Sequence, residues 1–313
     1  MIEPAKLSWR YGQPYSSAYQ DIYHDADGVG EVNRVFLGPA DFDGLLDSNR
    51  TLVVGELGFG TGLNFAVIAR RCQARGARLH FISFEAAPIA PDDFRRIASA
   101  RQAAEPAYAE LAALYPPLLA GWHHRSFADG RIRLSVYWGA ASAGLPSLTR
   151  QQTPVDLWLL DGFAPDRNPD MWSEDLFAHI GETAALGTRV TTFTSAGRVR
   201  RGLIAAGFEM RRVDQRPHKR ESLAGSFGRA GLARPGRPER VTVAGAGLAG
   251  AAVARELVSH GINVRVVDPA PEPASGASSI PATVMHPRLH HDGSDPAELK
   301  AITYAHAVAA TWS

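Results

Sequence analysis

The chain has 313 residues, enough for two domains, and its hydrophobic content of 45% and charged content of 21% are ordinary for a globular protein. The formal net charge of +1 excludes a strong overall attraction to nucleic acid, although most cations are arginines, which leaves a local basic patch open. A single cysteine, Cys72, excludes an intrachain disulfide framework and a cysteine-based zinc site. The sequence has neither a signal-peptide pattern nor an apolar run of membrane-spanning length. We therefore expect a cytoplasmic protein with no membrane partner, and a monomer is favoured.

The first 50 residues are rich in aromatic side chains, namely Trp9, Tyr11, Tyr15, Tyr19 and Tyr23. Short strands and turns are expected here. Two interpretations stay open, because the segment can cover the mouth of the following domain or can serve only as an aromatic packing segment. In both cases we expect residues 1–50 to pack on that domain.

A glycine-rich loop follows. An apolar run ends in Glu56, passes through Gly58, Gly60 and Gly62, and continues as an amphipathic pattern that includes Asn64. This pattern predicts a buried strand, a tight turn and the first turn of a helix. The spacing E-x-G-x-G-x-G differs from the dinucleotide pattern G-x-G-x-x-G and resembles the loop with which class I methyltransferases hold S-adenosylmethionine. We interpret these five residues as cofactor-binding. The alternative is a plain strand-to-helix turn, but such a turn needs only one glycine, whereas this loop has three glycines and an acid.

Strands and helices alternate from residue 51 to residue 227, which predicts a doubly wound, mostly parallel α/β sheet of the class I methyltransferase, Rossmann-like type. Further strands are expected at 79–85, 132–138, 155–161, 188–193, 208–213 and 222–227. Helices are expected at 63–74, 91–103, 106–114, 174–184 and 199–206. In such a sheet the ligand lies beyond the carboxyl ends of the central strands, so the residues that end each strand are the candidates for the site.

Two of these strand ends concern the nucleoside part of the cofactor. Glu85 ends the second strand and is placed to accept the ribose hydroxyls. The third strand ends in Trp138 and is followed by Ala140 rather than by an acid. We therefore expect backbone groups or apolar packing, with Trp138 as a candidate, to hold the adenine.

Asp161 ends the fourth strand after a wholly apolar run. Limited access to water is expected to raise its pKa unless another group pairs with it. Beside a methyl donor, this carboxylate can orient an incoming amine or accept its proton, so Asp161 is the candidate catalytic residue. The alternative is an aspartate that only caps the following turn. That turn carries Phe163 and Pro165, which we expect to contact a planar base.

Further polar and basic residues suggest a substrate rim. Asn168 begins a rigid polar turn, Arg198 and Arg200 lie at a helix start, and Lys219 and Arg220 form a second cationic group. Arginine with aromatic side chains suits phosphate contact and base stacking, which favours RNA over a solvated charged face. The histidine pairs at 123–124 and 290–291 lack metal-ligating partners at suitable spacing, so we interpret them as surface residues and expect no metal.

A second nucleotide-binding unit follows a linker at 228–239 that is rich in glycine, proline and arginine. Gly245, Gly247 and Gly250 have the G-x-G-x-x-G spacing between a strand and a helix, and Asp268 ends the next strand. This combination predicts a dinucleotide site in a Rossmann βαβ unit. Because only residues 240–313 are left for this domain, we expect it to be truncated or to be part of a longer chain.

Six motifs together resemble the MnmC family of bifunctional tRNA-modification proteins. They lie at 56–65, 81–85, 160–165, 168–172, 192–197 and 219–221. The resemblance extends over essentially the whole chain. It implies that residues 51–227 are an S-adenosylmethionine-dependent methyltransferase acting on 5-aminomethyl-2-thiouridine at the tRNA wobble position.

The same resemblance implies a C-terminal FAD-dependent oxidoreductase of the glycine/D-amino-acid oxidase type. In the family this part removes the carboxymethyl group of 5-carboxymethylaminomethyl-2-thiouridine and so generates the amine to be methylated. Gly245, Gly247, Gly250 and Asp268 match its FAD motif. The alternatives are a methyltransferase for a protein or small-molecule amine and a non-catalytic RNA-binding module.

Overall fold

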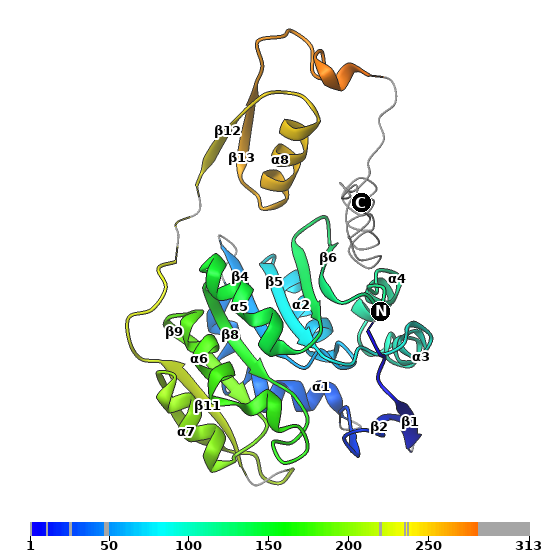
Figure 1. Ribbon diagram of the computed structural model, residues 1–313, viewed down its shortest axis with the longest axis vertical. Helices are drawn as coiled ribbons and strands as arrows, with labels where there is room; N and C mark the ends of the chain where they lie inside the picture. Colours follow the sequence, from blue (N-terminus) through cyan, green and yellow to red (C-terminus); the bar gives the residue numbers. More distant parts are fainter. Residues whose placement is uncertain are drawn as a thin grey trace, which may run out of the picture. The chain divides into compact units, whose positions relative to one another are not determined.

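The computed structural model describes residues 2–10, 12–24, 27–46, 50–218, 221–234, 236 and 238–280 (Figure 1). The chain divides into two compact units. The first comprises Met1–Arg125 and Ile132–Arg234, and the second comprises Ser126–Arg131 and Pro235–Ser313.

The centre of the first unit is an eight-stranded sheet with the order β10-β11-β9-β8-β4-β5-β7-β6 (Figure 1). Its strands are β4 (Thr51–Leu57), β5 (Arg78–Glu85), β6 (Gly121–Phe127), β7 (Ile132–Trp138), β8 (Val155–Leu160), β9 (Ala184–Thr192), β10 (Phe208–Asp214) and β11 (Glu221–Phe227). The five central strands β9, β8, β4, β5 and β7 run parallel, whereas β11 pairs antiparallel with β9 and with β10. The chain proceeds from β4 to one side and later returns to β8 on the other, so β4 and β8 flank the topological switch point where ligands bind in such sheets.

Helices form layers on the sheet. They are α2 (Leu63–Ala74), α3 (Pro91–Arg101), α4 (Ala107–Ala113), α5 (Ala141–Gln151), α6 (Glu174–Glu182) and α7 (Gly197–Ala205). Contacts join α2 with α4 and α3 with α4, and a separate series joins α5 with α6 and α6 with α7 (Figure 1). The arrangement is the predicted doubly wound α/β fold.

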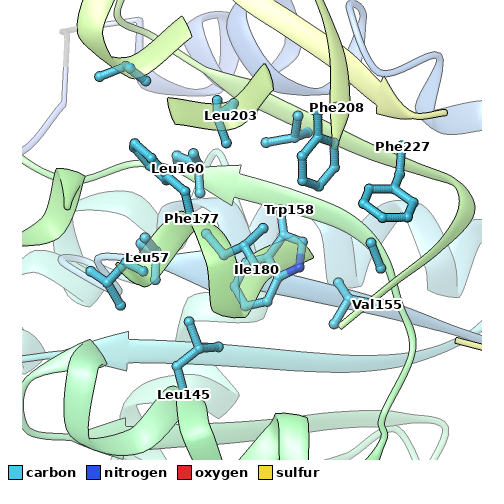
Figure 2. Close-up of a cluster of buried hydrophobic side chains, with 14 of the residues drawn as sticks. Leu57, Leu145, Val155, Trp158, Leu160, Phe177, Ile180, Leu203, Phe208 and Phe227 are labelled. Carbon is cyan, nitrogen blue, oxygen red and sulfur yellow. The ribbon is translucent and has the colours of Figure 1, made fainter. Parts of the chain in front are cut away.

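An apolar core lies under the second helix series (Figure 2). Its labelled members come from four strands and three helices and are Leu57, Leu145, Val155, Trp158, Leu160, Phe177, Ile180, Leu203, Phe208 and Phe227. Trp158 of β8 is fully buried, and its indole N–H donates to Oγ1 of Thr183 at 3.1 Å. This core fixes β8 and therefore the loop that follows it.

The N-terminal segment forms a small antiparallel sheet of β1 (Leu7–Arg10), β2 (Gln13–Ser16) and β3 (Asp21–Ile22). It continues as α1 (Gly28–Glu31), a π-helical turn η1 (Val32–Leu37) and a 3-10 turn η2 (Phe42–Leu45). The predicted short strands and turns are present, but the helical turns at 28–37 were not expected from the sequence.

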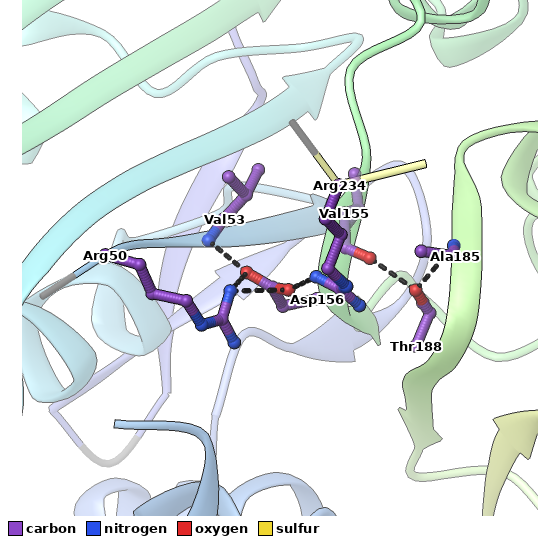
Figure 3. A network of polar contacts seen from close by, with 7 residues as sticks. All are labelled: Arg50, Val53, Val155, Asp156, Ala185, Thr188 and Arg234. Atoms are coloured by element: carbon purple, nitrogen blue, oxygen red, sulfur yellow. Dashed lines mark hydrogen bonds and ion pairs between the residues drawn. The ribbon is translucent and has the colours of Figure 1, made fainter. Parts of the chain in front are cut away.

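The segment after β11 is bound to the first unit by a buried carboxylate (Figure 3). Asp156 is 1% exposed and accepts hydrogen bonds from Nη1 of Arg50 at 2.9 Å and from the backbone N–H of Val53 at 2.8 Å. Arg234 completes the network as a second ion-pair partner. The backbone N–H of Leu232 also donates to the carbonyl of Ala184 at 2.8 Å. Part of the stretch predicted as a linker is therefore held against the sheet.

The second unit contains the predicted strand–helix–strand element. Strands β12 (Arg240–Ala244) and β13 (Asn263–Val267) pair in parallel, helix α8 (Leu248–Ser259) connects them, and a 3-10 turn η4 (Ala277–Ser279) follows. None of the residues of α8 is buried, and Leu248 is 63% exposed. The apolar side chains of this helix thus have little cover among the described residues.

Several expectations need correction. Strand β6 and helix α5 were not predicted, and β9 begins four residues earlier than expected. His123 is buried rather than at the surface, because its Nε2 contacts the carbonyl oxygen of Leu119 at 2.7 Å. The pair at 290–291 lies outside the described residues. Among the helices of the described part, none has the length and apolar character needed to cross a membrane.

Candidate active site at the carboxyl edge of the sheet

The glycine loop after β4 is shaped by the strands on both sides of it. The backbone N–H of Gly58 donates to the carbonyl of Phe84 at 2.9 Å, and that of Asp161 donates to the carbonyl of Leu57 at 3.0 Å. At Gly58 φ is +91°, and a Cβ there would overlap the carbonyl oxygen of Asp161. Only glycine allows this approach, which brings the loop after β8 directly against the loop after β4.

Asn64, in the first turn of α2, joins two acids of the site. Its Nδ2 donates to Oε1 of Glu56 at 2.9 Å and to Oδ2 of Asp161 at 2.6 Å. The opposite amide orientation would set its oxygen against both carboxylates, so the network determines which atom is the nitrogen. The remaining Asn64 Oδ1 is buried and has no hydrogen-bond partner. A ligand N–H donor bound there would satisfy it.

Glu56 lies deeper, with 1% exposure, and Ser83 Oγ donates to its Oε2 at 2.5 Å. Burial raises the pKa of Glu56 well above its usual value; the nearby charge of Asp161 adds to this rise, while the hydrogen bonds from Ser83 and Asn64 oppose it. Glu56 therefore contacts Asn64 and Ser83 and does not face solvent.

Glu85, at the end of β5, reaches the same loop. Its Oε2 accepts from the backbone N–H of Gly60 at 3.0 Å and its Oε1 from that of Ala87 at 2.9 Å. Burial raises its pKa, and these backbone hydrogen bonds partly offset the rise. A carboxylate has about four lone-pair sites, so Glu85 retains capacity for ligand hydroxyl groups.

The loop after β8 carries three of the predicted substrate residues. Pro165 is buried, while Phe163 and Asn168 are half-buried. The indole N–H of Trp172 donates to the carbonyl of Phe163 at 3.0 Å, and Asn168 precedes the 3-10 turn η3 (Pro169–Trp172). The backbone of Phe163, two residues after Asp161 in the sequence, is therefore held by Trp172.

Aromatic side chains of the N-terminal segment lie on this loop. Tyr19 stacks on Phe163 with ring centroids 4.4 Å apart and planes at 22°, and Tyr23 meets Phe163 edge-on at 5.3 Å. The ring of Tyr23 also lies so close to Gly60 that a Cβ there would be 3.2 Å from it. These contacts favour the interpretation in which the segment covers the mouth of the site. The aromatic composition of residues 1–50 had indicated that this segment packs on the following domain, but its contact with Phe163 was not predicted.

The predicted basic residues are only partly brought together. Arg198 forms an ion pair with Asp166 of the loop after β8 at 2.9 Å, and Arg200 is exposed on α7. Lys219 and Arg220 lie outside the described residues.

Trp138 is not available to a ligand, which corrects the suggestion that it packs against the adenine. It is fully buried, and its N–H donates to the carbonyl of Pro117 at 3.1 Å. Ala140 is the residue that precedes α5. In the part of the chain that the structure describes, no group of three or more His, Cys, Asp or Glu side chains could hold a metal ion.

In the second unit the four predicted residues meet. Oδ2 of Asp268 accepts from the backbone N–H of Ala246 at 2.7 Å, and its backbone hydrogen bonds lower the pKa of Asp268. A Cβ at Gly250 would overlap the carbonyl oxygen of Gly245, and Gly247 immediately precedes α8. The turn thus has the tight strand-to-helix geometry of a pyrophosphate site.

Two observations test the fit of these sites to their cofactors. The crowded glycine turn and the unpartnered Asn64 Oδ1 in the first unit fit the amino-acid part of S-adenosylmethionine, which offers an ammonium donor. The turn around Gly245 and Gly250 fits the nucleotide half of FAD.

Comparisons with known proteins agree with this assignment. Residues 102–227 match the family model of an S-adenosyl-L-methionine-dependent methyltransferase, and residues 240–312 match that of an FAD dependent oxidoreductase. S-adenosylmethionine and FAD are therefore the cofactors of the two matching families.

Curated relatives called tRNA 5-methylaminomethyl-2-thiouridine biosynthesis bifunctional protein MnmC are similar over nearly the whole chain. The protein of Thiobacillus denitrificans is 38% identical, over 97% of this chain and 50% of its own length. That of Chromobacterium violaceum is 39% identical, over 91% of this chain and 46% of its own. The chain therefore spans about half the length of the curated relatives it matches.

A crystal structure of MNMC2 from Aquifex aeolicus has a similar fold. The TM-score is 0.57 at 20% identity, with 74% of this chain and 73% of that chain covered. The chain matches a methyltransferase model and then an oxidoreductase model, and it is 38–39% identical to the curated MnmC proteins over more than nine-tenths of its length. It therefore belongs to the MnmC family of bifunctional proteins.

Proposed function

We propose that the first unit methylates the amine of 5-aminomethyl-2-thiouridine at the wobble position of tRNA, with S-adenosylmethionine as methyl donor. The observation that carries the proposal is the Asn64 amide, which holds Asp161 at 2.6 Å beside the glycine turn. This arrangement fixes a carboxylate at the switch point, next to the residues that fit the methyl donor.

Asp161 is the proposed catalytic residue. Bound S-adenosylmethionine supplies an electrophilic methyl group. Asp161 orients the acceptor amine and takes up the proton that the nitrogen loses when the new N–C bond forms and the bond between the methyl carbon and the donor sulfur breaks. Positioning contributes more than basicity here, because only the neutral amine is a nucleophile.

The other candidate residues have proposed binding roles. Glu56, Asn64, Glu85 and the three glycines hold the methyl donor. Phe163, Pro165 and Asn168 contact the acceptor base. Arg198, Arg200, Lys219 and Arg220 contact RNA phosphates; the exposure of Arg198 and Arg200 supports this role. A tRNA substrate makes the cytoplasm the proposed location, and a monomer the proposed state.

We propose residues 240–313 as part of an FAD-dependent oxidoreductase domain that in the whole protein supplies the amine from 5-carboxymethylaminomethyl-2-thiouridine. Gly245, Gly247, Gly250 and Asp268 would hold the FAD nucleotide. The proposed division is residues 1–50, 51–227, a linker at 228–239, and 240–313. A flavin absorbance band in the purified chain would support FAD binding by this part.

The test is methyl transfer from labelled S-adenosylmethionine by the purified chain to tRNA that lacks this methyl group. Label in the wobble nucleoside after digestion supports the proposal. Transfer only to proteins or small amines would support a different methyltransferase. RNA binding without any transfer would support a non-catalytic RNA-binding module.

A further inference from the structure

The stacked pair of Tyr19 and Phe163 joins two parts of the chain that are distant in sequence. Tyr19 lies in the turn between β2 and β3, and Phe163 follows β8. With Tyr23, which meets Phe163 edge-on, they form three rings that we call the aromatic box. The ring of Tyr23 lies beside Gly60. Phe163 is two residues after Asp161 in the sequence.

The position of the box relative to Glu85 supports a place at the site rather than in the core. Burial raises the pKa values of both Tyr19 and Tyr23, and the charge of Glu85 contributes to both shifts. Both rings are nevertheless half-buried and not fully enclosed. The box therefore combines apolar ring faces with access from solvent.

Arg167 holds the turn that carries Tyr19. Its Nη1 donates to the carbonyl of Tyr19 at 3.0 Å and also to the carbonyl of Gln20, and it lies 3.8 Å from Oδ2 of Asp21. Arg167 belongs to the same loop as Phe163, so one loop fixes both the backbone of Tyr19 and the ring on which Tyr19 stacks. The backbone of Tyr19 is thus anchored by hydrogen bonds that do not involve its ring.

We propose that Tyr19 and Phe163 sandwich the flat base of the acceptor nucleotide and that Arg167 is a positioning residue for Tyr19. The inference rests on the proposed methylation of an RNA base. Insertion of a base between the rings needs about 3.5 Å more separation, one layer of carbon contact, which rotation of Tyr19 provides. Stacking recognises the planar base itself, and Asp161 beside the box meets the amine attached to it.

The variants Tyr19→Phe and Tyr19→Leu separate stacking from packing. Phenylalanine keeps the ring, whereas leucine keeps much of the volume without a ring face. We expect Tyr19→Phe to behave like the wild type and Tyr19→Leu to raise KM for tRNA roughly 5- to 100-fold, as one lost base stack would. Its kcat and its affinity for S-adenosylmethionine should stay within about twofold, since the glycine turn keeps its contacts.

Tyr15→Leu is the matched control, because Tyr15 lies in the same small sheet and stacks with Arg10 rather than with Phe163. It should leave KM for tRNA unchanged even if the melting temperature falls. Arg167→Ala should raise KM for tRNA roughly 3- to 10-fold, in line with the loss of one or two hydrogen bonds, and Arg167→Lys should restore part of it.

Equal KM values for Tyr19→Leu and Tyr15→Leu would overturn the inference and leave the proposed function intact. So would a lower KM for Tyr19→Leu, since the ring would then compete with the base rather than stack on it. Wild-type chain that transfers no methyl group to tRNA would overturn both.

Discussion

The side-chain nitrogen of Asn64 lies 2.6 Å from Oδ2 of Asp161 and 2.9 Å from Oε1 of Glu56. One neutral amide thus separates two carboxylates that would otherwise repel each other at the end of neighbouring strands. Asn64 lies in the first turn of α2, from where its side chain reaches both. The strand that precedes the glycine loop and the loop after β8 are in this way joined through one side chain.

Asn64→Ala should weaken both functions of this link. Without the amide, Glu56 loses a partner while still buried, so the free energy of unfolding should fall by about 1–3 kcal/mol. We expect the dissociation constant for S-adenosylmethionine to rise tenfold or more, as a loss of roughly 1.4 kcal/mol would produce. Cys72→Ala, two turns later in α2 and also buried, is the control and should leave that constant unchanged. Unaltered affinity in Asn64→Ala would contradict the role of Asn64.

Asp161→Asn preserves the shape of the side chain and an oxygen to accept from Asn64, but it removes the proton acceptor. Turnover should fall about 10²-fold or more, while the affinity for S-adenosylmethionine stays close to that of the wild type. Single-turnover transfer to tRNA and equilibrium binding measure the two quantities separately. Asp166→Asn, an exposed residue of the same loop, controls for the loss of charge. Unchanged turnover in Asp161→Asn would remove Asp161 from the mechanism.

The pH dependence of stability should carry a signature of Glu56. Burial raises its pKa above the unfolded value of about 4.3, so the folded state binds this proton more tightly than the unfolded state. Its contribution to stability is then complete below about pH 4.3 and is lost as the pH rises toward the folded pKa. In Glu56→Gln the free energy of unfolding should therefore decline less with rising pH than in the wild type.

Urea unfolding of both proteins from pH 4 to pH 8 measures this difference. The exposed Glu110→Gln in α4 is the control and should follow the wild-type profile. Parallel profiles for Glu56→Gln and wild type would show that Glu56 does not bind its proton more tightly in the folded state.

Substitution of Asp156 should lower the free energy of unfolding strongly, although Asp156 is not one of the candidate site residues. Asp156→Ala leaves Arg50 and Arg234 facing each other without their carboxylate, and Val53 N–H without its acceptor. We expect a loss of about 2–4 kcal/mol in the free energy of unfolding, below the full cost of breaking a buried pair because both guanidinium groups reach solvent. Arg234→Ala should cost less, since Arg50 stays in place.

Limited proteolysis after residue 227 tests whether the ion pair of Arg234 with Asp156 holds the segment that follows β11. Arg234→Ala should speed cleavage in the 228–239 segment, because that segment loses its ion pair with the sheet. Asp92→Ala breaks an exposed pair within α3 and should change neither stability nor cleavage measurably. Equal cleavage rates for Arg234→Ala and wild type would mean that other contacts alone hold the segment.

Local patterns predicted much of the fold but not all of it. The helix Leu63–Ala74 and the strand Ile132–Trp138 have the predicted bounds because apolar periodicity and glycine boundaries are clear there. Strand β6 was missed because His123, His124 and Arg125 interrupt its apolar pattern, and α5 because it contains Gly144 and Pro146.

The candidate site, like the fold, was predicted only in part. Glu56, Glu85 and Asp161 lie at the carboxyl ends of parallel strands of one sheet, so topology alone predicts that they gather at one edge. The contact of Tyr19 with Phe163 depends on how the N-terminal sheet docks, which no local periodicity encodes. Trp138 illustrates the converse error, because its place at a strand end did not reveal that its ring points into the core.

Gly58→Ala tests the contact between the two loops of the site. The backbone at Gly58 has φ +91°, and an added Cβ would overlap the carbonyl oxygen of Asp161, so the loop after β8 must shift. Gly76→Ala is the matched control, since Gly76 has φ +64° but open space around the added Cβ. Both variants should lose roughly 1–3 kcal/mol through backbone strain, and only Gly58→Ala should also lose most of its affinity for S-adenosylmethionine and its turnover. If Gly58→Ala bound the methyl donor as tightly as Gly76→Ala, the close approach of the loops would not be what shapes the pocket.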